Sequence, residues 1–250
     1  ERLHGMQEVV GSIPSGSTRN FPPPRRAAPL IDAEAVARHI RAHLPLTPVP
    51  TVPEILIHKA GPRSGLAELA RLCGDGFQTP YWASWWGGGA GLARHLLDEP
   101  TLVSGKTVLD LGAGSGLAGI AAARAGAARV FASDTDPAAR VAASLNAAAN
   151  GVALELLPGD LTSGPAPAAD LVLVGDVFYE AALARRVTAL LDRCLAAGLE
   201  VLVGDPGRAD LPSPRLQLLA VHEGPDFATG GRPSSLNRVY RFVPERPPAP

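Results

Sequence analysis

A regular alternation of apolar strand-like runs and helical segments after Lys106 constrains the fold more than any other feature of this sequence. The predicted strands occupy 107–111, 128–134, 153–160, 169–176, 199–205, 215–224 and 235–243, and the predicted helices occupy 117–126, 137–151 and 180–198. Such alternation is typical of an α/β fold with a doubly wound, mostly parallel, seven-stranded sheet. The last two runs favour a hairpin that completes the sheet. In such a sheet, ligands bind at the carboxyl ends of the strands.

The first hundred residues follow another pattern. Residues 1–30 contain Gly, Ser and three consecutive prolines without periodicity, which predicts a flexible or disordered N-terminal extension. They contain no continuous apolar core of the kind that a secretory signal needs. Residues 31–100 predict a helical and extended segment that ends in an aromatic cap, and 101–250 form the α/β core. Within 31–100 we expect a helix over 33–44 capped by Asp32, an extended arm over 53–59, a helix near 65–73 and a Gly-rich entry into a helix over 87–100.

Composition excludes several classes of protein. The 23 basic and 24 acidic residues nearly cancel, which argues against a chain that coats nucleic acid. No apolar run approaches the ~20 residues that span a bilayer, so we expect a soluble, cytoplasmic protein without membrane partners. The cysteines, Cys73 and Cys194, both lie in apolar helical patterns and predict buried thiols rather than a disulfide. The scarcity of Lys beside abundant Arg, Ala, Gly and Pro indicates a high-GC bacterial source.

Glycines follow the first predicted strand of the core. The strand ends in Asp110, and the turn after it contains Gly112, Gly114 and Gly116. Glycines let the backbone turn tightly and approach a ligand beside the N-terminus of the next helix. Dinucleotide-binding folds use the similar spacing G-x-G-x-x-G, but here the third glycine is displaced.

Acidic residues end the next two strands. Asp134 follows the second strand, where a carboxylate suits ribose hydroxyls, and Asp160 with Leu161 follows the third, where the pair suits an adenine ring and its amine. Each residue alone is typical of a turn or a helix cap. Their occurrence at successive strand ends, together with Asp110 and the glycine turn, predicts a site for S-adenosylmethionine.

The fourth strand ends in Asp176-Val177-Phe178-Tyr179, which in this class of sheet faces the methyl group. The sequence there is not Asn-Pro-Pro-Tyr, the loop typical of methylation of base amines or glutamine amides. All three tryptophans lie within five positions, at Trp82, Trp85 and Trp86. Such clustered aromatic residues line a binding channel or seal a core, and both interpretations stay open for each Trp.

Other chemical motifs are absent from the sequence. His39 and His43 share a helical face, but no Glu completes H-E-x-x-H, and we predict no metal site. Neither a G-x-S-x-G nucleophile turn nor a phosphate-binding G-x-x-x-x-G-K-[ST] loop occurs. Arg185, Arg186 and Arg193 follow helical spacing and predict a solvated helix face.

Several segments together resemble the electron transfer flavoprotein β-subunit lysine methyltransferase family of seven-strand, class I, Rossmann-like enzymes. These segments are LDLGAGSGLAGIAAA, ASDTDP, GDVFYE and VLVGDPGR, preceded in the same order by PEILIH, PYWASWWGGG and LARHLLDEP. The resemblance covers about 45–208. It implies S-adenosylmethionine-dependent methylation of lysines on the flavoprotein β subunit, by a monomer or weak oligomer located in the mitochondrial matrix if the source is eukaryotic.

The sequence departs from this family at two places. The family often has Gln where Ala90 stands, in the turn before the LARHLL helix, which implies that one polar contact to the cofactor is missing. Near the C-terminus the family tends to have Thr-x-Val-Trp, and this chain has Asn237-Arg238-Val239-Tyr240. The chemistry is therefore more firmly implied than the acceptor.

The predicted roles follow from the chemistry of a lysine acceptor. Asp176 is expected to orient the amine, while Phe178, Tyr179 and Trp86 line its channel, because an aromatic face tolerates a methylated ammonium. The expected cofactor contacts are Trp86, Asp110, Gly112, Gly114, Gly116, Asp134, Asp160, Leu161 and Asp176. Two alternatives stay open: a same-fold methyltransferase that acts on a ribosomal protein or a small amine, and a module that binds S-adenosylmethionine without turnover.

Overall fold

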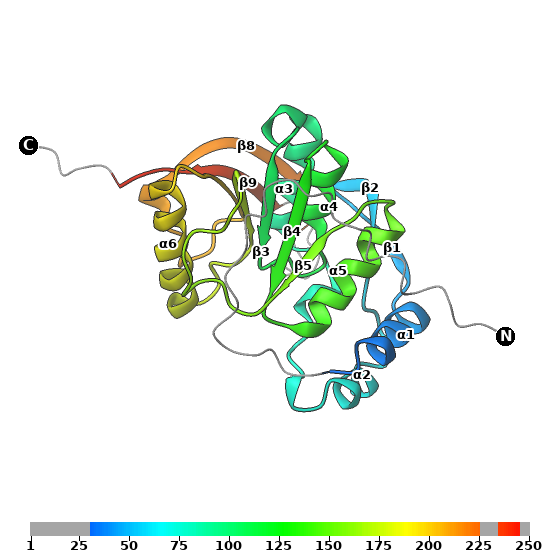
Figure 1. Ribbon diagram of the computed structural model, residues 1–250. Coiled ribbons are helices and arrows are strands. Elements are labelled where there is room, and N and C mark those ends of the chain that lie inside the picture. Colours follow the sequence, from blue (N-terminus) through cyan, green and yellow to red (C-terminus); the bar gives the residue numbers. More distant parts are fainter. Residues whose placement is uncertain (1–30, 226–234, 246–250) are drawn as a thin grey trace, which may run out of the picture.

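A central sheet with helices on both faces forms the body of the molecule (Figure 1). This architecture comes from a computed structural model, which describes residues 31–225 and 235–245. The predicted flexible extension at 1–30 lies outside the described residues. Seven strands run in the order β5-β4-β3-β6-β7-β9-β8. Their bounds are β3 Thr107–Leu111, β4 Arg129–Asp134, β5 Glu155–Pro158, β6 Leu171–Gly175, β7 Glu200–Asp205, β8 Leu216–Gly224 and β9 Ser235–Phe242.

The pairing of the strands confirms the predicted mostly parallel sheet. Strands β3 to β7 pair in parallel, and β9 pairs antiparallel with both β7 and β8. The predicted C-terminal hairpin is therefore present, and it adds an antiparallel edge to the sheet. Because β3, β4, β5, β6 and β7 point the same way, their carboxyl ends meet along one edge.

The helices of the core lie close to their predicted positions. They are α3 Gly87–Asp98, α4 Leu117–Arg124, α5 Pro137–Ala149 and α6 Ala181–Ala196. Helix α5 begins as the sequence indicates: the Asp136 side chain accepts a hydrogen bond from the backbone N–H of Ala138, and Pro137 occupies the first helical position.

Two helices and a small second sheet precede the core. They are α1 Ala33–His43, β1 Leu46–Val49, β2 Val52–His58 and α2 Leu66–Cys73. The Asp32 side chain caps α1 as expected, by accepting from the N–H of Ala35. Strand β2 confirms the predicted extended arm, whereas β1 was not expected, since a proline interrupts its pattern. Side-chain oxygens of Asn146 on α5 and of Asn150, which caps its C-terminus, accept backbone N–H groups of β2 and attach the small sheet to the body.

Both faces of the large sheet are buried. Along β6, Leu171 and Leu173 pack toward α3 and α4, while Val172 and Val174 belong to the cluster under α6. This alternation explains why the strand is continuously apolar in sequence. The two cysteines are buried free thiols in separate clusters, as predicted.

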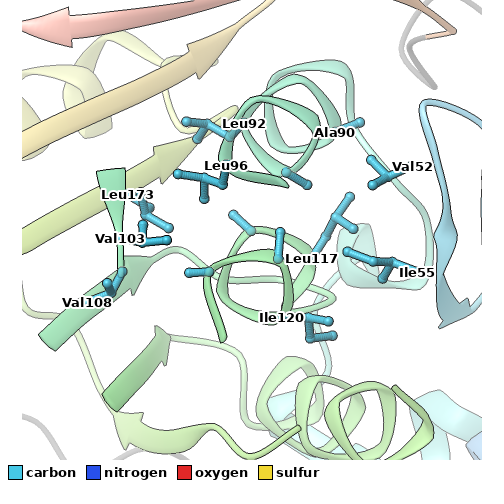
Figure 2. Close-up of a cluster of buried hydrophobic side chains, with 14 of the residues drawn as sticks. Val52, Ile55, Ala90, Leu92, Leu96, Val103, Val108, Leu117, Ile120 and Leu173 are labelled. Carbon is cyan, nitrogen blue, oxygen red and sulfur yellow. The ribbon is translucent and has the colours of Figure 1, made fainter. Parts of the chain in front are cut away.

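The cluster toward α3 and α4 joins the segment before residue 100 to the segment after it (Figure 2). Val52 and Ile55 from β2 and Leu92 from α3 belong to the same cluster as Ile120 from α4 and Leu173 from β6. The predicted boundary at residue 100 therefore separates segments that share one core. Among the helices in the described ranges, none combines the length and the apolar character that crossing a bilayer requires.

Candidate functional site

The N-terminus of α3 meets the carboxyl ends of β6 and β7 at unusually short range. A Cβ added to Gly88 would lie 2.2 Å from the carbonyl oxygen of Gly204, and one added to Gly175 would lie 3.0 Å from the Cα of Gly89. Only glycine permits this approach. It brings the N–H of Gly89, in the first turn of α3, to the end of β6.

A cavity of about 430 Å³ opens at this edge, between the strand ends and the aromatic segment that precedes α3. This volume is within the usual range for a small-molecule site. Glycines 112 and 114 lie on the wall with positive φ angles of 69° and 52°, and so expose backbone rather than side chains to the cavity. The predicted residues on the wall are Trp86, Asp110, Gly112, Gly114, Asp134, Asp160, Leu161, Asp176 and Tyr179.

Asp110 is buried at the end of β3, with 2% of its surface exposed. One carboxylate oxygen accepts a hydrogen bond from the N–H of Gly119, 2.8 Å away in the first turn of α4. Burial raises the pKa of the carboxyl to about 7; the Gly119 N–H opposes this rise and the nearby Asp134 adds to it. Asp110 therefore fixes the start of α4 relative to β3.

Asp134 ends β4 and ties two loops together. Its carboxylate accepts the N–H of Gly114 at 2.8 Å and that of Asp136 at 2.9 Å. Burial raises its pKa, while those hydrogen bonds and the charge of Arg140 oppose the rise. The glycine turn after β3 and the start of α5 are thus held by one side chain.

Asp160 and Leu161 lie on the cavity wall after β5. The Asp160 carboxylate is exposed and accepts the N–H and the hydroxyl of Thr162. Arg193 donates to the carbonyl oxygens of Thr162 and Gly164 and so braces this loop from α6.

The three arginines predicted to form a solvated face of α6 therefore differ from one another. Arg185 and Arg186 are exposed, as predicted, although Arg186 also lines the cavity, whereas Arg193 is half-buried and holds the backbone of the loop after β5. The helical spacing did not reveal that the loop after β5 packs beside this face.

Asp176 follows β6 in a left-handed backbone conformation with φ 56°, the one positive φ among the described non-glycine residues. Such a conformation is strained and often found at functional sites. One carboxylate oxygen accepts the N–H of Gly89 at 2.7 Å, and the other accepts from Arg208 Nη2 at 2.7 Å. Burial raises the pKa of Asp176 to about 6; Arg208 and the Gly89 N–H pull it down, and Asp205 pushes it up.

Arg208 was missed as a site residue, although the motif GDPGR contains it. Its guanidinium lies 5.7 Å from the centre of the Trp86 ring, within the range of a cation–π contact. Trp86 in turn donates from Nε1 to the carbonyl oxygen of Tyr81. Tyr81 and Tyr179, both exposed, have ring centres 6.4 Å apart on the cavity wall. Nothing local in the sequence indicates that Arg208 reaches Asp176.

Two predicted residues do not lie on the cavity wall. Phe178 is fully buried in the cluster under α6, because it points away from the carboxyl edge while Tyr179 beside it faces the cavity. Gly116 is the N-cap of α4 and lies against Ala143 of α5, so it shapes the turn from the side that faces away from the cavity. The structure therefore places Phe178 in the core rather than in the predicted channel.

The tryptophans divide between the two interpretations. Trp82 is buried and also lines the cavity, whereas Trp85 packs against the core with Lys59 over its ring. Ala90, which stands where the family often has Gln, is buried in the core and does not line the cavity. This difference from the family therefore lies behind the cavity wall. Asn237 is buried against Gly91 of α3.

The two histidines considered for a metal are used in packing. His39 is buried, its Nε2 lies 2.9 Å from the carbonyl oxygen of Ser64, and its ring lies against that of His43. Within 31–225 and 235–245, no group of three or more His, Cys, Asp or Glu side chains is arranged to hold a metal ion.

Comparison with known proteins gives matches to methyltransferases. Residues 94–193 match the family model of ribosomal protein L11 methyltransferase (PrmA). A solved structure from Pyrococcus horikoshii, described as a candidate RNA methyltransferase, superposes with a TM-score of 0.50 at 16% identity and covers 72% of this chain and 97% of that one. At this level of identity the superposition shows the fold, which is that of class I methyltransferases.

Two relatives with curated names carry the name electron transfer flavoprotein beta subunit lysine methyltransferase. The protein from Rattus norvegicus is 41% identical over 143 residues, which are 56% of each chain. The protein from Xenopus laevis is 40% identical over 177 residues, which are 70% of this chain and 71% of that one. This chain thus spans about half the length of the rat relative. Both sources are animals, and the predicted bacterial source and cytoplasmic location stay predictions.

The identity with the frog protein extends over more than two thirds of both chains, at a level that chance does not produce. The chain therefore belongs to the electron transfer flavoprotein beta subunit lysine methyltransferase family.

Proposed function

We propose that this protein transfers a methyl group from S-adenosylmethionine to lysine side chains of the electron transfer flavoprotein β subunit. The observation that carries the proposal is the cavity at the carboxyl edge of the sheet, with Asp176 held on its wall by Gly89 and Arg208. Family membership supports the acceptor, since the relatives bear that name.

The residues on the wall fit S-adenosylmethionine. Gly112 and Gly114 expose backbone that a side chain would cover, and the first turn of α4 begins just beyond them. In the proposed binding mode Asp134 accepts ribose hydroxyls, while Asp160 and Leu161 flank the adenine. When bound, this cofactor supplies an electrophilic methyl group on a sulfonium.

Asp134 has acceptor capacity left for such a role. A carboxylate has about four lone-pair positions, and the backbone N–H groups of Gly114 and Asp136 occupy one on each oxygen. Asp110, by contrast, is 2% exposed, so we assign it to shaping the turn rather than to a polar contact of its own.

The part of the cavity wall beside Asp176 suits an amine acceptor. Tyr81, Tyr179 and Trp86 present aromatic surface beside Asp176. A lysine amine has an ordinary pKa near ~10.4 and must lose a proton before it can act as a nucleophile. Aromatic walls exclude water and so favour the uncharged amine, while Asp176 orients it through a hydrogen bond.

The match of residues 94–193 to the L11 methyltransferase model supplies a second acceptor to compare with the β subunit. The test therefore sets two acceptors in competition. Purified protein would be incubated with labelled S-adenosylmethionine and equal amounts of recombinant flavoprotein β subunit and ribosomal protein L11, and the labelled residues mapped by mass spectrometry.

We expect label on lysines of the β subunit. Label on L11 alone would keep the methyltransferase and replace the acceptor. Cofactor binding measured by calorimetry, with no label on either protein or in a cell lysate, would favour a module that binds without turnover.

A further inference from the structure

Arg208 is the charged side chain that pairs with Asp176, the residue proposed to orient the amine. Its Nη2 donates to Asp176 Oδ1 at 2.7 Å, and both side chains line the cavity. The side chains of Arg208 and Asp176 are 18% and 9% exposed, respectively. An ion pair so shielded from water is stronger than one on the surface.

The Arg208 guanidinium is held in place from behind. Asp205, which is fully buried, accepts the backbone N–H groups of Gly207 and Arg208 on one carboxylate oxygen, each at 2.7 Å. The face of Trp86 lies against the guanidinium. These contacts fix the loop after β7 so that Arg208 points toward Asp176 rather than into solvent.

An unpaired carboxylate at this position would work against methyl transfer to an amine. It would bind a lysine as the ammonium ion and raise the amine pKa, since an opposite charge within ~4–6 Å favours the charged form. A nearby cation has the reverse effect. Arg208 pairs with Asp176 at 2.7 Å and lies farther from the second carboxylate beside it, with Nε 3.9 Å from Asp205 Oδ2. The wall therefore offers a hydrogen-bond acceptor whose charge is largely offset.

We infer that Arg208 is a positioning residue that compensates the charge of Asp176, so that the site receives the acceptor lysine as an uncharged amine. This inference rests on the proposed function and deepens it. Arg208 acts on the amine through its ion pair with Asp176 and does not contact the transferred methyl group.

The charges around Asp176 are consistent with this role. On the elements packed against it, Arg208 and Asp205 belong to β7 and its following loop, and α3 contributes the N–H of Gly89. Burial raises the Asp176 pKa, and Arg208 is the largest opposing influence. The other charged residues on the cavity wall are Asp110, Asp134, Asp136, Asp160, Glu180 and Arg186, and its tyrosines are Tyr81 and Tyr179.

Arg208→Gln and Arg208→Lys separate charge from structure. In the full chain, the Asp176 carboxyl would be titrated by carbon-detected NMR, with its signal assigned from Asp176→Asn. The pH dependence of kcat for methylation of the β subunit, which reports groups in the bound complex, and the Kd for S-adenosylmethionine would be measured on the same variants. Arg129→Gln, which removes an exposed arginine paired with Glu155 on the opposite part of the sheet, is the matched control.

In Arg208→Gln we expect the Asp176 pKa to rise by about one unit or more, because an opposing cation has been lost. The acid limb of kcat should move to higher pH by a similar amount, with most of the rate recovered in alkaline buffer. Arg208→Lys should restore part of both shifts, and Arg129→Gln should change neither.

Three results would overturn the inference. An equal loss of kcat at every pH, with an unchanged Asp176 pKa, would make Arg208 merely structural. A weaker Kd for S-adenosylmethionine without a shifted pH profile would make it a cofactor ligand. Failure of the wild-type protein to methylate would instead refute the proposed function, and the role toward the amine with it.

Discussion

The cavity is lined by two halves that are built in different ways. On the β3–β4 half, Asp110 accepts the N–H of Gly119, 9 positions further along the chain, and Asp134 accepts the N–H of Gly114, 20 positions back. On the β6–β7 half, Asp176 accepts from Gly89 and Arg208, which are 87 and 32 positions away. The first half is assembled from neighbouring segments, and the second from segments that only folding brings together.

This difference separates two kinds of function for an acidic residue. Asp110 and Asp134 hold the loops that shape one wall, because their carboxylates accept hydrogen bonds from backbone N–H groups of those loops. Asp176 instead receives a charged side chain and a helix N-terminus, so its charge is set by groups from elsewhere in the chain. Changes on the two halves should therefore have different consequences.

The largest effect is expected at Asp176. Asp176→Asn keeps the shape of the side chain but replaces one acceptor oxygen with an NH₂ group and breaks the ion pair with Arg208, so methyl transfer should fall by about 10²-fold through misplacement of the amine. S-adenosylmethionine should bind with nearly unchanged affinity in calorimetry. Asp192→Asn removes an exposed carboxylate on α6 and serves as the control. If the variant methylated at the wild-type rate, the Asp176 carboxylate would have no role in orienting the amine, and the proposed functional difference between the β6–β7 and β3–β4 halves would be wrong.

The second-largest effect is expected where α3 packs closely against the ends of β6 and β7, on the β6–β7 half of the cavity. In Gly88→Ala the new Cβ would lie 2.2 Å from the Gly204 carbonyl oxygen, so α3 must move away from β7. We expect the free energy of unfolding in urea to fall by about 1–3 kcal/mol, as for other overpacked sites. Gly61→Ala, whose Cβ would meet no atom within 4 Å, should be close to neutral. Equal stabilities would show that the approach of α3 to the sheet is not tight.

On the first half, the expected effect is a pH dependence of stability. The pKa of Asp110 is about 7 in the folded chain and 3.8 ordinarily, so the folded state keeps a proton that the unfolded state has lost. Stability should therefore fall as pH rises through this interval, by at most about 1.4 kcal/mol per pH unit for one group.

Asp110→Asn stays uncharged and can still accept from Gly119, so its free energy of unfolding should depend less steeply on pH. Urea unfolding of the cofactor-free protein at several pH values measures the slope. A slope identical to that of the wild type would assign the pH dependence to other carboxyls, such as Asp134, whose pKa is also raised by burial.

The smallest expected effect is at the aromatic rim. Tyr179 is 60% exposed, so Tyr179→Ala should leave the melting temperature unchanged. It should raise KM for the protein acceptor several-fold, since an aromatic contact contributes roughly 0.5–1.5 kcal/mol. Leu218→Ala, a 53% exposed apolar residue on the edge strand β8, controls for the loss of exposed apolar surface. An unchanged KM would place the acceptor elsewhere on the rim.

The sequence predicted the fold well because its signals are local. Alternation of apolar runs with helical segments and the cap at Asp32 both act within a few residues. The one strand that was missed, β1, contains Pro48, and its pairing with β2 is a contact that local patterns do not report.

The candidate site was only partly predictable. Residues that directly follow strands, such as Asp134 and Asp176, were found because the carboxyl edge of a parallel sheet gathers whatever stands at its strand ends. The sequence could not say which of the adjacent Phe178 and Tyr179 faces the cavity. That depends on the backbone conformation of Asp176 and on how α6 packs.

The sequence by itself determined the order of strands and helices along the chain and the glycine turn at the first strand, because each depends on local propensity and pattern. The tertiary structure alone decided that four glycines in α3, β6 and β7 meet, and that Arg208 reaches Asp176. Contacts of this kind join distant segments of the chain, and their geometry is set by how the whole core packs.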